Sequence, residues 1–204
     1  IGGARSGKSA LAERRAAESG LRVVYVATAL VQDAEMERRI AHHRARRPAD
    51  WGLVEAPLQL AAALRAHAAR DTCLVVDCLT LWLSQLICPP AGVAAVDAGR
   101  ATALTLQALR SAPGYVIVVS NEIGLGVVPT DAVTRRVVDA LGRLHQDLIR
   151  AGWPVTASIG SVTTIEATST ESLLRQADHV LYEVKKSGKA AVRSAEAGDA
   201  HPVT

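Results

Sequence analysis

The chain has 204 residues, about half of them apolar, which is enough to bury the core of one domain with or without an appendage. Its formal net charge is +3, and the pI of about 9.0 suits an anionic partner such as a nucleotide. No basic stretch is rich in aromatic residues, which argues against single-stranded nucleic acid as the ligand.

The cysteines and the hydropathy pattern predict a cytoplasmic location. Cys73 and Cys78 lie in or beside an apolar run and are expected to be small core residues. With Cys88 the count is odd and matches no zinc-site spacing or disulfide framework, which favours a reducing compartment. Neither a signal peptide nor a long uncharged apolar span is recognisable, so we expect no membrane span.

The first nine residues, IGGARSGKS, contain the phosphate-binding pattern G-x-x-x-x-G-K-[ST]. In such a loop the backbone N–H groups surround a phosphate, Lys8 reaches the β- and γ-phosphates, and the Ser9 hydroxyl ligates Mg²⁺. Only Ile1 precedes the loop, so the strand that should hold it is expected to be truncated. The predicted nucleotide-binding residues here are Gly2, Gly3, Ala4, Arg5, Ser6, Gly7, Lys8 and Ser9.

The rest of the chain predicts alternating helices and strands. Helices are expected over residues 8–18, 33–47, 56–69, 79–87, 93–112 and 133–150, and buried strands over 21–28, 71–77 and 115–120. The strands are near-continuous apolar runs, which is typical of a parallel sheet covered on both faces. The pattern therefore predicts an α/β fold, a mainly parallel sheet flanked by helices, with ligands bound at the carboxyl ends of the strands.

Polar residues follow three of these strands, and they are the candidates for chemistry. Asp77 closes the strand LVVD, where a P-loop protein places the carboxylate that holds Mg²⁺ directly or through water. Thr28 closes the first strand, and Asn121-Glu122 leads into a glycine-broken loop suited to an active-site mouth. An ordinary helix cap at Asp77 and an ordinary connection at residues 121–129 remain open alternatives.

A basic helix is the second notable feature. Seven of ten consecutive side chains are cationic or titratable, namely Arg38, Arg39, His42, His43, Arg44, Arg46 and Arg47. Met36, Ile40 and His43 are spaced to share one partly apolar helix face, whereas His42 points about 100° away. A solvated basic face is the simpler interpretation, and a triphosphate-binding strip with a nucleophilic imidazole is the alternative.

Five stretches together resemble the bifunctional adenosylcobinamide kinase / adenosylcobinamide-phosphate guanylyltransferase family of cobalamin biosynthesis. They are GGARSGKS, VVYVATA, IAHHRARRPADWGLVEAP, LVVDCLTLWLSQL and VVSNEIGLGVVP, and they span residues 1–150. The resemblance implies a RecA-like P-loop fold, phosphorylation of cobinamide by ATP or GTP, and GMP transfer from GTP through a GMP-histidine. It also implies Mg²⁺ as cofactor and a homo-oligomer, a trimer.

The same resemblance assigns roles to single residues. His43 matches the guanylylated, catalytic histidine, with His42 as the fallback. Asp77 stands where bacterial members of the family carry Glu, so the reach of its carboxylate is shorter by one methylene. Ser9 and Asp77 are the expected ligands of the metal. The remaining residues expected to bind the nucleotide are Ala27, Thr28, Ala29, Arg44, Ala45, Arg46, Arg47, Glu55 and Asp77.

Beyond residue 150 the chain resembles the C-terminal end of a GGDEF (diguanylate cyclase) domain, at residues 155–160 and 172–188. The glycine–acidic signature loop is missing from the sequence, so cyclase activity is not predicted. We expect a P-loop domain over 1–150, a strand-loop-helix extension over 151–187 and a disordered end over 188–204. Within the extension, the strand is expected over 154–159 and the helix over 170–186. The extension is either a fused segment that only adds to the fold or, preferred here, a substitute for the last strand of the sheet.

The function expected is therefore that of a cobinamide-phosphorylating and guanylyl-transferring enzyme. Two alternatives stay open. One is a P-loop kinase for another small hydroxyl substrate, and the other is a non-catalytic GTP-binding module.

Overall fold

The computed structural model describes residues 1–3, 6–124, 129–154, 159–163 and 192–196; for residues 39, 42, 46, 159–163 and 192–196 it describes the backbone without the side chain. It divides into a larger unit, Gly7–Trp153, and a smaller one that combines Ile1–Ser6 with Pro154–Thr204. Each unit is described by itself. Among the described residues, no helix is long and apolar enough to cross a membrane.

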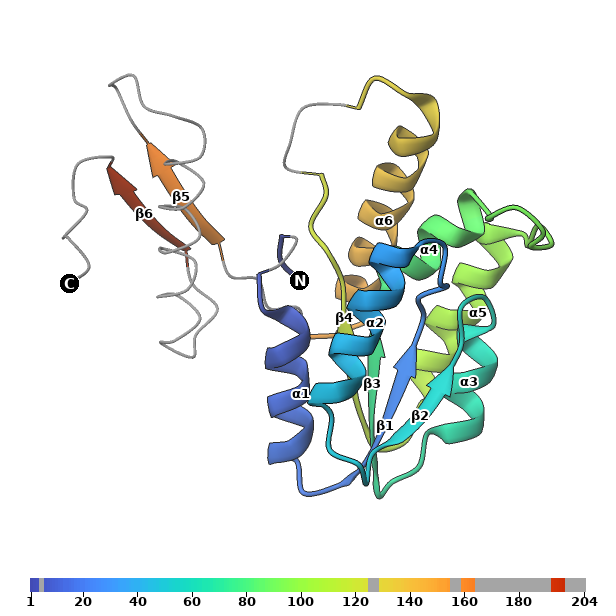
Figure 1. Cartoon of the computed structure of the whole chain (residues 1–204), viewed down its shortest axis with the longest axis vertical. Helices are drawn as coiled ribbons and strands as arrows, with labels where there is room; N and C mark the ends of the chain where they lie inside the picture. The colour runs from blue at the N-terminus through green and yellow to red at the C-terminus, as the bar shows by residue number, and fades with distance from the viewer. Residues whose placement is uncertain (4–5, 125–128, 155–158, 164–191, 197–204) are drawn as a thin grey trace. The chain divides into compact units, whose positions relative to one another are not determined.

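A parallel sheet of four strands is the centre of the larger unit (Figure 1). Its strands, in spatial order, are β2 (Gly52–Glu55), β1 (Arg22–Ala27), β3 (Thr72–Asp77) and β4 (Tyr115–Val119). In the register of the sheet, Ala27 lies opposite Asp77, and Asp77 opposite Val119. The carboxyl ends of the strands therefore meet at one edge, as the sequence predicts.

Six helices surround this sheet in the described part of the larger unit: α1 (Lys8–Glu18), α2 (Ala34–Arg46), α3 (Leu60–His67), α4 (Leu79–Ile87), α5 (Ala98–Ser111) and α6 (Ala132–Arg150). Three of them begin after an aspartate whose carboxylate accepts the backbone N–H three residues on, Asp33 from Met36, Asp97 from Arg100 and Asp131 from Thr134. Such caps satisfy otherwise unpaired N–H groups, which explains where these helices start.

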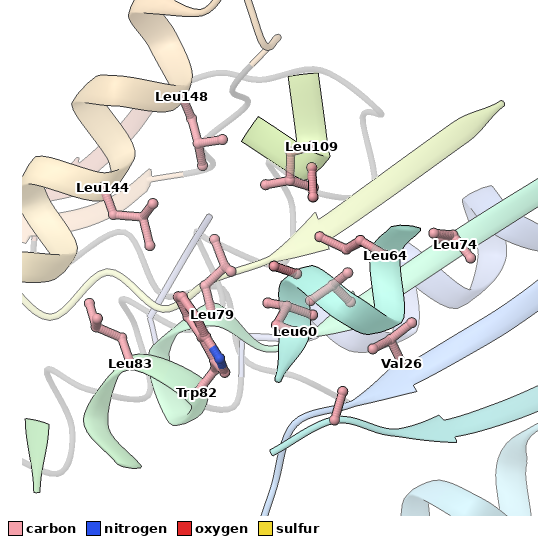
Figure 2. Close-up of a cluster of buried hydrophobic side chains, with 14 of the residues drawn as sticks. Val26, Leu60, Leu64, Leu74, Leu79, Trp82, Leu83, Leu109, Leu144 and Leu148 are labelled. Atoms are coloured by element: carbon pink, nitrogen blue, oxygen red, sulfur yellow. The ribbon is translucent and has the colours of Figure 1, made fainter. Parts of the chain in front are cut away.

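Alternation along the strands divides the core into two layers. Even-numbered residues such as Val26 and Leu74 face α3 to α6, where they join Leu64, Trp82 and Leu144 in a continuous cluster (Figure 2). Odd-numbered residues face α1; these are Val23, Tyr25, Cys73 and Val75, and they pack with Ala12 and Ala16. Both predicted core cysteines, Cys73 and Cys78, are buried.

The predicted α/β fold with a parallel sheet is confirmed; one strand was not predicted, and two helices begin four or five residues later than expected. Strand β2 was not predicted, because this short edge strand is largely exposed and carries no apolar run. Helix α3 begins at Leu60 rather than at residue 56, since the N–H of Ala56 is bonded to the carbonyl of Ala27. Helix α5 begins at Ala98, behind its Asp97 cap, rather than at residue 93.

The smaller unit contains a separate two-stranded parallel sheet, β5 (Ile159–Thr163) paired with β6 (Val192–Glu196). The strand expected over residues 154–159 shares only Ile159 with β5. In the described residues β5 pairs with β6, and residues 155–158, which make up most of the expected strand, lie outside the description. Strand β6 falls in the range expected to be disordered, and the helix expected over 170–186 lies outside the described residues.

Candidate active site

Helix α1 begins at the carboxyl edge of the sheet. Gly7 caps it with φ 76° and ψ 13°, a left-handed conformation that glycine adopts without steric cost. Burial lowers the pKa of Lys8, while Cys78 and Asp77 oppose this change. Because burial raises the pKa of the Cys78 thiol to about 11, Asp77 is the countercharge of Lys8 at neutral pH.

The predicted phosphate loop is divided between the two units. Gly7, Lys8 and Ser9 belong to the larger unit, and Ser9 is partly buried in the first turn of α1. Gly2, Gly3 and Ser6 belong to the smaller unit, whereas residues 4 and 5 lie outside the description.

Thr28 joins the ends of β1 and β3. Its fully buried hydroxyl accepts a hydrogen bond from the N–H of Cys78 (2.7 Å) and donates one to the Cys78 carbonyl (2.8 Å). The N–H of Thr28 donates to the carbonyl of Asp77 (3.2 Å). The hydroxyl of Thr28 thus holds the backbone beside Asp77 in place. Ala27 and Ala29, which were also predicted to lie at the nucleotide, flank Thr28 in the chain.

Tyr25 is a site residue that sequence reasoning missed. Its hydroxyl donates a 2.6 Å hydrogen bond to Oδ2 of Asp77, and the side chain is only 2% exposed. Burial, and then the Asp77 carboxylate, raise the pKa of Tyr25, which keeps it a donor. The available signal was a lone hydroxyl in the apolar run VVYVA, but its partner depends on strand register.

Two contacts attach the C-terminal end of α2 to the sheet. The guanidinium of Arg47 lies 3.4 Å from the centroid of the Tyr25 ring, a cation–π contact. Nη2 of Arg44 donates a 2.6 Å bond to Oε1 of Glu55, at the end of β2. The second pair is exposed and contributes little to stability, but it places two predicted residues together. Ala45, also predicted, follows Arg44 on α2, and the side chain of Arg46 is not described.

His43 faces helix α1. Its Nδ1 lies 3.9 Å from Oε1 of Glu13, and the two side chains are 31% and 12% exposed. Met36, Ile40 and His43 are all partly buried, which confirms the face predicted for them. The side chain of His42 lies outside the described residues.

Gln85 of α4 braces the loops after β1 and β2, and sequence reasoning did not single it out. Its Nε2 donates to the carbonyls of Thr28 (2.8 Å) and Pro57 (3.0 Å), and its Oε1 accepts from the N–H of Leu30 (2.9 Å). All its hydrogen-bonding groups serve backbone partners, so its role is to fix these loops.

The end of β4 leads to a cavity. The N–H of Asn121 donates to Thr80 Oγ1 (2.8 Å), and Ser120 Oγ lies 2.7 Å from Nε2 of His145. A cavity of about 380 Å³ lies between this segment and α6, lined in part by Glu122 and His145. Glu122 therefore borders a cavity and Asn121 precedes it, while residues 125–128 lie outside the description.

Comparison with known proteins identifies the family. The family model for cobinamide kinase / cobinamide phosphate guanyltransferase matches residues 1–162. The chain belongs to this family. It is 54% identical over 163 residues to the bifunctional adenosylcobalamin biosynthesis protein CobP of Pseudomonas aeruginosa, which covers 79% of this chain and 92% of the relative.

Two further relatives of the cobinamide kinase family are the proteins CobU of Salmonella typhimurium and Escherichia coli. They are 35% and 33% identical over 174 and 172 residues, which is 78% of this chain and 94% of each relative. The resemblance drawn from five sequence stretches is thereby confirmed. The family match runs past residue 150, where our comparison stopped, and reaches into β5.

Within this family member, the described residues contain no group of three or more His, Cys, Asp or Glu side chains that could hold a metal ion. The predicted Mg²⁺ ligands are instead one hydroxyl, Ser9, and one carboxylate, Asp77. That set suits Mg²⁺, which is usually held by one or two carboxylates together with substrate phosphates and water.

Proposed function

We propose that the protein phosphorylates adenosylcobinamide with ATP or GTP and then transfers GMP from GTP to that product, giving adenosylcobinamide-GDP. The observation that carries this proposal is the grouping of Lys8, Asp77 and the His43 helix at the carboxyl edge of a parallel sheet. The names of the relatives, which are bifunctional adenosylcobalamin biosynthesis proteins, support it.

In the phosphoryl-transfer step, positioning and charge stabilisation supply most of the catalysis. Lys8 attracts the β- and γ-phosphates, and the first-turn N–H groups of α1 supply further donors. Ser9 and Asp77 would hold Mg²⁺, which neutralises developing charge on the phosphates. The hydroxyl of Tyr25 would keep the Asp77 carboxylate oriented for this role.

In the guanylyl-transfer step, His43 is the proposed nucleophile. Its imidazole attacks the α-phosphorus of GTP, pyrophosphate leaves, and the phosphate of the cobinamide product then takes GMP from the histidine. Arg44 supplies positive charge one residue away, and donors of this kind stabilise the transferring phosphoryl group.

Incubation of the purified protein with α-labelled GTP tests this proposal. We expect an acid-labile GMP–protein adduct that is lost in His43→Gln and retained in His67→Gln, a histidine variant on α3. Absence of the adduct from the wild type, or its persistence in His43→Gln, contradicts the guanylyl-transfer step. Nucleotide binding without turnover would instead support the non-catalytic module.

The substrate is tested separately, by phosphate transfer from γ-labelled ATP or GTP to cobinamide and to simple amino alcohols. We expect transfer to cobinamide alone; transfer only to the small alcohols would favour the alternative kinase. We further propose a cytoplasmic homotrimer whose catalytic domain is residues 1–150, with 151–187 as a non-catalytic extension. Light scattering of the purified chain tests the trimer.

A further inference from the structure

We propose that Glu13 is a positioning residue for His43, whose carboxylate holds the imidazole with its proton on Nδ1 so that Nε2 attacks phosphorus. This inference rests on the proposed guanylyl transfer. It assigns to helix α1 a second task, besides presenting Lys8 and Ser9 to phosphate.

The burial of Glu13 is unusual for its position. Two acidic side chains lie on α1, and that of Glu18 is 58% exposed and paired with Arg14, as expected on a surface helix. The side chain of Glu13 is only 12% exposed, next to the buried Ala12. Taking a carboxylate out of water is costly unless a cationic or hydrogen-bonding group compensates for the loss, and the imidazole of His43 is such a group within ion-pair distance.

Glu13 faces the site rather than the solvent. Its Oε1 lies 3.9 Å from Nδ1 of His43 on the neighbouring helix. It also acts on Tyr25, whose pKa is raised first by burial and by Asp77 and to a smaller extent by Glu13. Glu13 therefore lies on the same face of the sheet as the Tyr25–Asp77 hydrogen bond. Its negative charge acts on both His43 and Tyr25.

The chemistry of an attacking imidazole explains what this carboxylate does. A neutral imidazole carries one proton, and the partner of one ring nitrogen decides which nitrogen keeps the lone pair. A carboxylate opposite Nδ1 favours the proton there and leaves Nε2 as the nucleophile, just as carboxylates orient histidines in hydrolase triads and at metals.

Guanylylation of His43 and the transfer of GMP to the acceptor need no further reacting group. The Nε2 lone pair forms the P–N bond, the bond from the α-phosphorus to the bridging oxygen breaks, and pyrophosphate leaves with that electron pair. The proton stays on Nδ1, so the ring becomes cationic and Glu13 stabilises it. When a phosphate oxygen of the acceptor attacks, the P–N electron pair returns to Nε2 and the neutral ring is restored.

The 3.9 Å separation is an ion-pair distance, longer than a hydrogen bond. Hydrogen bonds of catalytic groups are often long in the free enzyme and shorten in the substrate complex. We expect the Nδ1–Oε1 distance to shorten when GTP binds and α2 approaches α1.

The test compares Glu13→Gln, Glu13→Asp and the matched control Glu18→Gln on the same helix. Adduct formation from α-labelled GTP is expected to slow by about 10- to 100-fold in Glu13→Gln, the usual cost of losing such a partner. Phosphorylation of cobinamide should slow by less. Glu13→Asp should recover part of the rate because it keeps the charge, and Glu18→Gln should equal the wild type.

Long-range ¹H–¹⁵N NMR of His43 gives a readout that a merely structural role would not change. We expect the Nδ1-protonated tautomer in the wild type and a shift toward the Nε2-protonated form in Glu13→Gln. The Nε2-protonated form in the wild type overturns the inference even if a variant fails to fold. An adduct made equally fast by Glu13→Gln overturns it while the proposed function stands; a wild type that makes no adduct overturns both.

Discussion

At the scale of single residues, the site depends on two interactions of the Asp77 carboxylate. Its Oδ2 accepts from Tyr25, while its charge attracts Lys8. The register of β1 and β3 places Tyr25 opposite Val75, so Asp77 is the diagonal neighbour two residues on, within reach of an aromatic side chain. This arrangement fixes the orientation of the Asp77 carboxylate.

Replacing Tyr25 with Phe removes this hydroxyl and keeps the ring beneath Arg47. We expect a loss of about 1.5–3 kcal/mol in the free energy of unfolding, because the lost hydrogen bond has a charged partner. Phosphorylation should also slow, since Asp77 loses its orientation. Urea denaturation and initial rates measure both effects. Tyr115→Phe, at a hydroxyl on an exposed part of β4, is the control; equal results for the two variants contradict this role of Tyr25.

We expect the stability of the fold to depend on pH because of the environment of His145. Burial lowers its pKa from the ordinary 6.5, while Glu122 opposes the change. A lowered pKa means that the folded protein binds this proton less readily than the unfolded chain. The stabilisation is therefore present above about pH 6.5 and is lost as the pH falls through the lower, folded-state value.

The measurement is the urea midpoint between about pH 8 and about pH 5, across the histidine range. The wild type should lose stability toward acid, and His145→Gln should lose less of it. His67→Gln serves as control and should follow the wild-type curve. If the urea midpoint of His145→Gln falls with pH as steeply as that of the wild type, groups other than His145 cause the pH dependence of stability.

At the scale of elements, the entry into β4 depends on one glycine. Gly114 has φ +83°, and a Cβ there would lie 2.0 Å from the carbonyl oxygen of Ala69 and 2.6 Å from that of Thr72. Both obstacles are backbone atoms, one before β3 and one at its first residue, so neither can rotate away. The close approach of these two segments brings β4 alongside β3 and positions its polar end.

Gly114→Ala is therefore expected to destabilise the fold by more than about 1–2 kcal/mol, the cost of the left-handed conformation alone. Gly142→Ala is the matched control, because nothing lies within 4 Å of its added Cβ in the middle of α6. There alanine should stabilise by about 0.5–1 kcal/mol. Thermal and urea unfolding separate the two variants; a neutral Gly114→Ala would contradict the described approach.

At the scale of the whole molecule, nucleotide binding should couple to stability. A ligand that binds only the folded protein stabilises it, by about 2.7 kcal/mol at a hundredfold excess over Kd. We expect GTP to raise the unfolding midpoint of the wild type and not that of Lys8→Ala. Arg14→Ala, an exposed cation on the same helix, should keep the response. A full response in Lys8→Ala would exclude the phosphate loop as the binding site.

The sequence by itself determined the kind of fold, the phosphate-binding motif and the family. These depend on local signals: continuous apolar runs, helix caps such as Asp33, and the spacing of Gly7, Lys8 and Ser9. It was weakest at β2, an exposed edge strand without an apolar run, and at β6, which lies in a polar stretch.

Only the tertiary structure decided which side chains serve the site together. Tyr25 and Asp77 are 52 residues apart, and Thr28 and Cys78 are 50 apart; they meet because strand register aligns them. Glu13 meets His43 because two helices pack on one face of the sheet. Such partners leave no periodic pattern in the sequence, since their contact is set by the packing of elements and not by spacing along the chain.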